Sequence, residues 1–138
     1  MSVERTGPGR DSAEELVAEA RAAAVNAYAP YSRFRVGAVA VDADGNRYTG
    51  ANVENSAYGA TICAEGSAIS HAVSCGARHL DTVAVACLDA DDADGGYPCG
   101  NCRQLMAEFG VKRVIVDTVE GPRVHTLADL LPFGFKFD

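Results

Sequence analysis

The feature that most constrains the fold of this chain is a pair of cysteine motifs that lie far apart in the sequence. The first is C-A-E at residues 63–65, and the second is P-C-G-N-C at residues 98–102. Three thiolates can occupy three corners of the tetrahedron that zinc prefers. The motifs therefore predict one zinc per chain, with Cys63, Cys99 and Cys102 as ligands and with room between them for a helix, a strand and a loop.

Glu65 follows the first cysteine by two residues, where it can serve the chemistry of such a metal. Zinc with an open fourth position lowers the pKa of bound water towards neutrality, and a neighbouring carboxylate can then move protons. The residue order matches the H-x-E…P-C-x-x-C signature of zinc nucleobase deaminases, in which a cysteine can replace the histidine. The motif predicts a zinc hydrolase that acts on a small molecule, with Glu65 as its catalytic residue.

A structural zinc site, or a buried pair of free thiols, is the alternative to a catalytic site. Structural zinc is normally closed by a fourth protein ligand. The remaining cysteines and histidines show no ligand spacing: Cys75, Cys87, His71, His79 and His125. A catalytic zinc is favoured, while a non-catalytic, zinc-stabilised binding module stays open as a function of another class.

The composition fits one domain with a real core, because 48% of the 138 residues are hydrophobic and 22% are charged. Residues 1–10 are rich in Gly, Pro and Arg and lack the apolar core of a signal peptide. We expect residues 1–10 to form a disordered arm and residues 11–138 to form a single zinc-dependent domain.

The charge balance restricts the partners. The chain has 19 acidic and 12 basic residues, a net charge of −7, whereas proteins that bind nucleic acid usually carry a basic stripe. No apolar run is long enough to span a membrane. Because the cysteines have metal-binding spacing, a reducing compartment is expected. These features predict a cytoplasmic protein without nucleic-acid or membrane partners.

Periodicity and turn signals predict the order α-β-β-α-β-α-β-β. The expected helices are Ser12–Tyr28, Thr61–Cys75, Cys99–Phe109 and a last turn at Leu127–Leu131. The expected strands are Phe34–Val41, Arg47–Val53, Thr82–Leu88, Arg113–Val116 and Arg123–Thr126. This order describes an α/β fold, a mixed β-sheet of about five strands covered by helices.

The layout places the cysteines at the N-termini of two predicted helices. Unpaired backbone N–H groups and the helix dipole favour anions there, so we expect thiolate formation to be favoured. Glu65 falls in a first helical turn, from which it can lean over the metal without binding it.

Four segments of the chain resemble small, single-domain cytidine deaminases of the three-cysteine type. They are Y-S-R-F-R-V-G-A (31–38), N-V-E-N-S-A-Y-G (52–59), T-I-C-A-E (61–65) and P-C-G-N-C-R-Q (98–104). The zinc motifs are shared with other deaminases, but the first two segments are more specific to enzymes that act on nucleosides. The likeness covers nearly the whole chain.

The resemblance implies a zinc-dependent conversion of cytidine or deoxycytidine to uridine or deoxyuridine, with release of ammonia. It implies that Asn52 and Glu54 hold the ribose hydroxyls and that Phe34 packs against the pyrimidine. Phe135 matches a residue that the family lends to a neighbouring subunit, and Tyr58 matches an interface position. The expected assembly is a homotetramer, with a homodimer as the alternative.

The residue types support the ribose contacts of Asn52 and Glu54 more directly than the contacts of the two phenylalanines. Asn52 and Glu54 share one face of an extended segment, and an amide with a carboxylate suits a polyol but repels phosphate. Without the flanking pattern, Asn52 could equally cap a turn and Glu54 could be solvated. Phe34 and Phe135 could equally be core residues.

The chain also departs from the family pattern. Gly66 and Ser67 follow Glu65, where the family usually has an Arg that offsets the negative charge of three thiolates on zinc. Helix dipoles, Ser67 or Arg103 would then balance that charge. Tyr97 and Asn101 stand where small residues are common, so the pocket shape is expected to differ. A blasticidin-type nucleoside antibiotic is therefore the alternative substrate.

Overall fold

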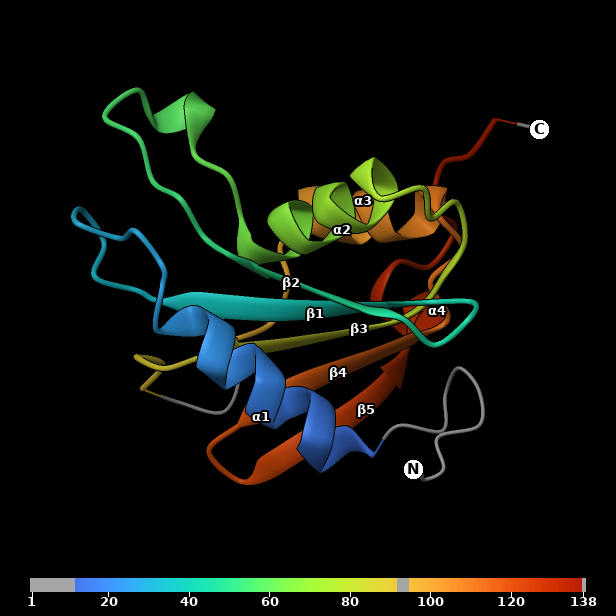
Figure 1. The fold of residues 1–138 in the computed structure, drawn as a ribbon, viewed down its shortest axis with the longest axis horizontal. Coiled ribbons are helices and arrows are strands. Elements are labelled where there is room, and N and C mark those ends of the chain that lie inside the picture. The colour runs from blue at the N-terminus through green and yellow to red at the C-terminus, as the bar shows by residue number, and fades with distance from the viewer. Residues whose placement is uncertain (1–11, 92–94, 138) are drawn as a thin grey trace.

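The computed structural model describes residues 12–91 and 95–137, which share one five-stranded mixed sheet (Figure 1). The arm expected at residues 1–10 lies outside the described residues. The helices are α1 (Ala13–Ala24), α2 (Ala64–Ser74), α3 (Gly100–Glu108) and α4 (Leu127–Leu130), with a 3-10 turn η1 (Tyr58–Ala60). The strands are β1 (Val36–Asp42), β2 (Arg47–Ala51), β3 (Leu80–Cys87), β4 (Arg113–Thr118) and β5 (Gly121–Thr126).

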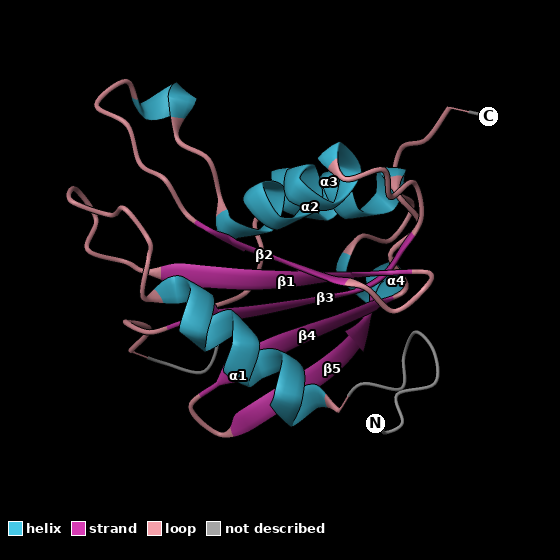
Figure 2. Cartoon of the chain, in the orientation of Figure 1, coloured by secondary structure: helices cyan, strands magenta, loops and turns pink. Residues whose placement is uncertain are grey.

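The sheet has the order β2-β1-β3-β4-β5, in which only the β3–β4 pair is parallel. Helix α1 covers one face, and α2 and α3 lie side by side on the other (Figure 2). Each face has its own apolar core, and β3 contributes to both: Val83 and Val85 face α2, while Ala84 and Ala86 face α1. The α/β fold predicted from the sequence is thus confirmed.

Helix α1 begins as predicted but ends earlier. The Ser12 hydroxyl accepts a hydrogen bond from the Glu15 backbone N–H at 3.0 Å, which caps the helix. The predicted end at Tyr28 is wrong, because α1 stops at Ala24. Tyr28 instead pairs with the segment after β2: its N–H donates to the Asn52 carbonyl, and its carbonyl accepts from Glu54. This tertiary pairing outweighs the helical periodicity.

Gly50 on β2 sets how closely α2 approaches the sheet. A Cβ atom there would lie 2.3 Å from the Ala68 backbone nitrogen and 2.8 Å from the Ala64 carbonyl oxygen. Contacts that short are excluded, so only glycine allows α2 to pack at this distance. The start of α2 carries the first cysteine motif, and its position therefore depends on Gly50.

The segment between β2 and α2 contains a helical turn and a projection that the sequence did not predict. Residues 52–62 leave the sheet, form η1 and project away from the body of the molecule (Figure 1). Val53 pairs with Ile62 across the base of this projection. Within the described residues, no helix is both long and apolar enough to cross a bilayer.

Candidate metal centre and adjoining cavity

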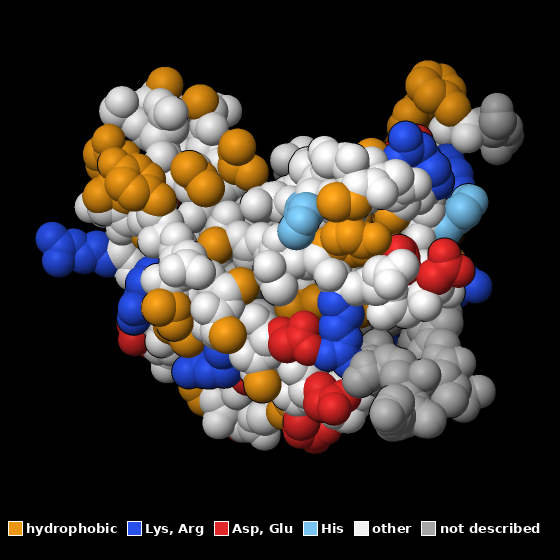
Figure 3. All heavy atoms as spheres, in the orientation of Figure 1, with side chains coloured by type: hydrophobic (Ala, Val, Ile, Leu, Met, Phe, Trp, Pro, Cys, Tyr) orange, Lys and Arg blue, Asp and Glu red, His pale blue; other side chains and the backbone are white. Residues whose placement is uncertain are grey.

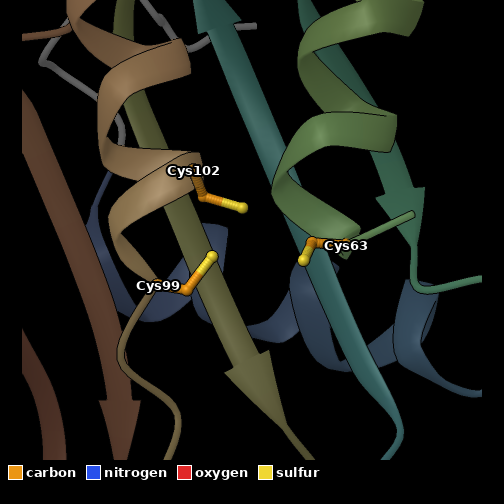
Figure 4. Close-up of side chains that lie close together, drawn as sticks. All are labelled: Cys63, Cys99 and Cys102. Atoms are coloured by element: carbon orange, nitrogen blue, oxygen red, sulfur yellow. The ribbon is translucent and has the colours of Figure 1, made fainter. Parts of the chain in front are cut away.

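The three predicted zinc ligands meet where α2 and α3 begin. Cys63 is the N-cap of α2, Cys99 is the N-cap of α3, and Cys102 lies in the first turn of α3. Their sulfur atoms all lie within 4.8 Å of one another, and Figure 4 shows the three side chains pointing toward a common centre. The fold thus brings together two motifs that are far apart in the sequence.

The donor set fits a zinc ion with one open position. Zn–S bonds of about 2.3 Å in a tetrahedron place sulfur atoms about 3.8 Å apart, which agrees with the observed grouping. Within residues 12–91 and 95–137, no fourth His, Cys, Asp or Glu belongs to this group. A closed structural site would need such a ligand, so the arrangement favours a site that leaves a position for water or substrate.

The pKa values of the three thiols are shifted in different directions, whereas the sequence predicted the same effect at both helix N-termini. Burial raises the pKa of Cys63 and of Cys102. Burial acts on Cys99 in the same direction, but hydrogen bonds from the backbone N–H groups of Cys102 and Asn101 help to bring its pKa below the ordinary value. The expected thiolate-favouring effect of the helix N-terminus therefore prevails at Cys99, and burial outweighs it at the other two cysteines.

Glu65 is a buried acid beside this centre. Its side chain is 5% exposed and lines the same cavity as Cys63 and Cys99, without belonging to the metal-binding group. Burial raises the pKa of Glu65, and hydrogen bonds to its own backbone and to Cys102 oppose this in part. A carboxyl group in this position can exchange protons with whatever occupies the cavity.

The cavity over the cysteines has a volume of about 200 Å³ and lies next to a larger hollow of about 530 Å³. The two share part of their walls: Phe34, Val36, Asn52 and Thr61. The larger hollow extends to the projecting segment 52–62, where hydrophobic side chains gather on the surface (Figure 3). The larger hollow and the cysteine cavity are thus neighbours across these four residues.

Asn52 lines both spaces and is 8% exposed. Its side-chain amide donates to the Phe34 carbonyl at 2.8 Å, and its oxygen accepts from the Val36 N–H at 2.9 Å. These bonds hold the chain as it enters β1, and they leave one N–H and one lone pair for a ligand. Asn52 therefore has a structural task that the sequence did not reveal.

Glu54 has a similar double position. Its carboxylate accepts hydrogen bonds from the backbone N–H groups of Tyr31 and Ser32 at 2.9 and 3.1 Å, and from the Ser32 hydroxyl. The Ser32 hydroxyl is the largest cause of a lowered pKa for Glu54, so the carboxylate stays ionised near neutral pH. It lines the larger hollow beside Tyr31 and Ser32, two residues of the Y-S-R-F segment to which no role was assigned from the sequence.

Phe135 is the predicted site residue that the fold does not bring to the others. It lies after α4, is 66% exposed, and lines a separate hollow with Lys112 and Leu131. Tyr58 lines the larger hollow but is 90% exposed. Within one chain, Phe135 is therefore not part of the cysteine cavity.

Gly66 departs from the family pattern, and Arg103 is one of the groups expected to balance the thiolate charge in its place. Gly66 is buried on α2, and a Cβ atom there would meet Leu105 Cδ1 of α3 at an ordinary 3.5 Å. Arg103 donates to the carbonyls of Pro98 and Leu130 at 2.8 and 2.7 Å. Its guanidinium therefore holds the chain in front of Cys99, a different task from the expected balance of thiolate charge.

The family model of the cytidine and deoxycytidylate deaminase zinc-binding region matches residues 10–118. A cytidine deaminase of Sporosarcina psychrophila is 45% identical over 126 residues, which is 89% of this chain and 90% of that protein. One from Mycobacterium tuberculosis is 44% identical over 123 residues, 89% of either chain.

Solved structures agree with this similarity. The crystal structure of a cytidine deaminase from Burkholderia pseudomallei superposes with a TM-score of 0.80 at 38% identity, covering 91% of this chain and 100% of that one. A cytidine deaminase from Mycobacterium tuberculosis superposes with a TM-score of 0.75 at 40% identity, covering 90% and 97% of the two chains.

Proposed function

This chain belongs to the cytidine and deoxycytidylate deaminase family, and we propose that its substrate is cytidine or deoxycytidine. It is a zinc-dependent deaminase of pyrimidine nucleosides, which releases ammonia and leaves uridine or deoxyuridine. The observation that carries the choice of substrate is that the cavity lined by Cys63 and Cys99 adjoins the hollow lined by Glu54, with Phe34 and Asn52 on the walls of both.

The cysteines and Glu65 supply the chemistry in this proposal. Cys63, Cys99 and Cys102 would hold zinc, which would supply a Lewis acid that lowers the pKa of bound water. Glu65 accepts a proton from the attacking water and delivers protons to the ring nitrogen and to the departing ammonia. Because Glu65 is buried beside the cysteines, few solvent molecules compete for these protons.

The remaining residues hold the substrate. Phe34 lines both parts of the hollow and offers its ring to the pyrimidine. The ionised Glu54 accepts from a ribose hydroxyl, and the free N–H of Asn52 donates to it. The described walls of the larger hollow contain no Lys or Arg, so a phosphate beside Glu54 would meet a negative charge without a counter-ion. This argues for a nucleoside over a nucleotide.

An ultraviolet assay of the purified protein with cytidine, deoxycytidine, cytosine, deoxycytidine monophosphate and blasticidin S tests the proposal. We expect turnover of the two nucleosides and little of the free base or the nucleotide. Preferred turnover of blasticidin S would instead support the antibiotic as substrate.

Glu65→Gln separates an enzyme from a binding module. We expect this variant to keep its zinc and to lose at least about 10²-fold in kcat, because proton transfer is lost. A wild-type protein that binds zinc but turns over none of the compounds would favour the non-catalytic alternative.

We also propose that the protein acts as a homo-oligomer, a homotetramer or a homodimer, in the cytoplasm. The strongly exposed aromatic side chains of Tyr58, Phe133, Phe135 and Phe137 support an interface between copies. The reduced thiols that the zinc site needs agree with a reducing compartment.

A further inference from the structure

Tyr97 stands on the wall of the cysteine cavity, immediately before Pro98 and Cys99. It lines the cavity together with Phe34, Glu65 and Cys99, and it is half-buried. The proposed reaction gives it no task. Its surroundings nevertheless differ from those of an ordinary core tyrosine.

The hydroxyl of Tyr97 lies 2.7 Å from Nε2 of His125, a hydrogen-bonding distance, and the two rings are 5.3 Å apart. Arg123 Nη1 also donates to this hydroxyl, at 3.4 Å, and Arg123 is paired with Glu120 at 3.0 Å. The hydroxyl end of the Tyr97 side chain is therefore fixed to β5, while Tyr97 also lines the cavity.

The position of Arg123 and His125 in the sheet explains why both side chains can contact Tyr97. Arg123 and His125 are two residues apart on β5, so their side chains point to the same face. They pair with Val116 and Val114 of β4, which belong to the core beneath α2 and α3. The edge strand β5 thus contacts Tyr97, a residue of the cavity wall, through these two side chains.

The segment that Tyr97 belongs to has little regular support. Residues 95–99 lie in no helix or strand, and Cys99 is the last of them. Side-chain contacts hold this segment: His125 and Arg123 bind the Tyr97 hydroxyl, and Arg103 Nε donates to the Pro98 carbonyl at 2.8 Å. Because Tyr97 and Cys99 are two residues apart, a contact that restrains Tyr97 also restrains the position of Cys99 relative to Cys63 and Cys102.

We propose that the hydrogen bond between Tyr97 and His125 is a positioning contact: it holds residues 95–99 so that Cys99 meets the other two cysteines and the cavity wall keeps its shape. Tyr97 and His125 are positioning residues, since they act through Cys99 and the wall. The turnover part of the test rests on the proposed function; the metal part does not.

Two variants remove the contact from either side, Tyr97→Phe and His125→Leu. We expect each to release zinc to a chromophoric chelator faster than the wild type, and to lower kcat for cytidine about three- to tenfold, the factor that one neutral hydrogen bond represents. The double variant should be no worse than the worse single variant, because both remove the same contact. His125→Gln, which presents a side-chain nitrogen near the Nε2 position, should restore most of the loss.

Tyr48→Phe is the matched control. The Tyr48 hydroxyl donates to Asp42 Oδ2 at 3.1 Å in the β1–β2 hairpin, away from the cavity lining. This variant loses a comparable hydroxyl contact, but we expect its zinc release and kcat to match the wild type.

Unchanged zinc release and kcat in Tyr97→Phe would overturn the proposal, and so would an equal effect of Tyr48→Phe, which would indicate general destabilisation. Because Tyr97→Phe preserves the ring, it keeps the test decisive even if His125→Leu does not fold. If the wild type deaminates no nucleoside, the proposed function fails, while the comparison of zinc release still decides the role of the contact.

Discussion

The polar side-chain groups of Asn52 and Glu54 bind the protein's own backbone, and the same groups would bind a ribose. Asn52 joins the backbone of Phe34 and Val36, and Glu54 collects the N–H groups of Tyr31 and Ser32. Substitution of either residue would disturb the chain around Phe34 as well as remove a substrate contact. Loss of activity in such variants would therefore combine the disturbed chain with the lost ribose contact.

The cysteines allow a cleaner test at the residue scale. We expect Cys99→Ala to lose most of its zinc and its activity, because two thiols do not complete the ligand set. Cys75→Ala is the control: Cys75 is an exposed thiol at the C-terminus of α2, outside the metal-binding group. Elemental analysis of both purified variants measures the outcome. Full zinc occupancy in Cys99→Ala would contradict the ligand assignment.

At the scale of elements, the position of α2 on the sheet decides where Cys63 and Glu65 lie. Helix α2 packs directly over β2 because Gly50 has no side chain. The N-terminus of α2 can therefore meet that of α3 above the middle of the sheet (Figure 4).

Gly50→Ala should destabilise the fold by about 2–3 kcal/mol, since the new methyl group overlaps the α2 backbone. Any shift of α2 also moves Cys63, so zinc binding should weaken with it. Gly59→Ala is the control, because no atom lies within 4 Å of its added Cβ, and its effect should stay within about 0.5 kcal/mol. Denaturant unfolding measures both. Equal stability of the two variants would show that α2 can move away without cost.

A second contact between elements predicts a dependence on pH. The guanidinium of Arg35, just before β1, binds the carboxylate of Asp89, just after β3, at 2.9 and 3.0 Å. These hydrogen bonds are the largest cause that lowers the pKa of Asp89 from 3.8 to about 2. A carboxyl group whose pKa falls on folding stabilises the fold above its unfolded value and loses that effect as pH drops through its folded value.

We therefore expect Asp89→Asn to melt below the wild type at neutral pH, with a gap that closes as pH falls from about 4 to about 2. The exposed Asp91, which has no such ion pair among residues 12–91 and 95–137, provides the control variant Asp91→Asn. Melting temperatures across this range measure the effect. A gap of constant size down to pH 2 would mean that Asp89 acts through something other than its charge.

In the whole molecule, a single chain leaves several aromatic side chains exposed to solvent. The residues near the C-terminus, Phe133, Phe135 and Phe137, are more than half exposed, and so is Tyr58 on the projecting segment. Where exposed apolar side chains form a contiguous patch, the patch often marks an interface with another molecule.

We accordingly expect sedimentation at assay concentration to give a dimer or tetramer, and Phe135→Ala to raise KM or to weaken the assembly. Phe109 also borders a groove, but it packs against the α2–α3 core; Phe109→Ala should therefore reduce stability first. An active, strictly monomeric wild-type protein would refute the oligomer.

The order of the elements was predictable because each depends on local signals. Ser12 caps α1, glycine ends α2 and α3 with positive φ angles at Gly76 and Gly110, and Gly45 turns the first hairpin. The errors lie where distant segments compete with local preference. Tyr28 leaves its helix to pair beside Asn52, and neither residue alone reveals this.

The metal chemistry of this protein could be predicted from its residues alone, since the type and spacing of Cys63, Glu65, Cys99 and Cys102 are local features of the chain. How these groups behave depends on the folded chain. Burial raises the pKa of Cys63 and Cys102, whereas hydrogen bonds lower that of Cys99 despite its burial, and a hydrogen bond from β5 reaches Tyr97 across 28 positions of sequence. Burial and long-range contacts depend on which segments meet in space, and the local pattern of residues does not contain that information.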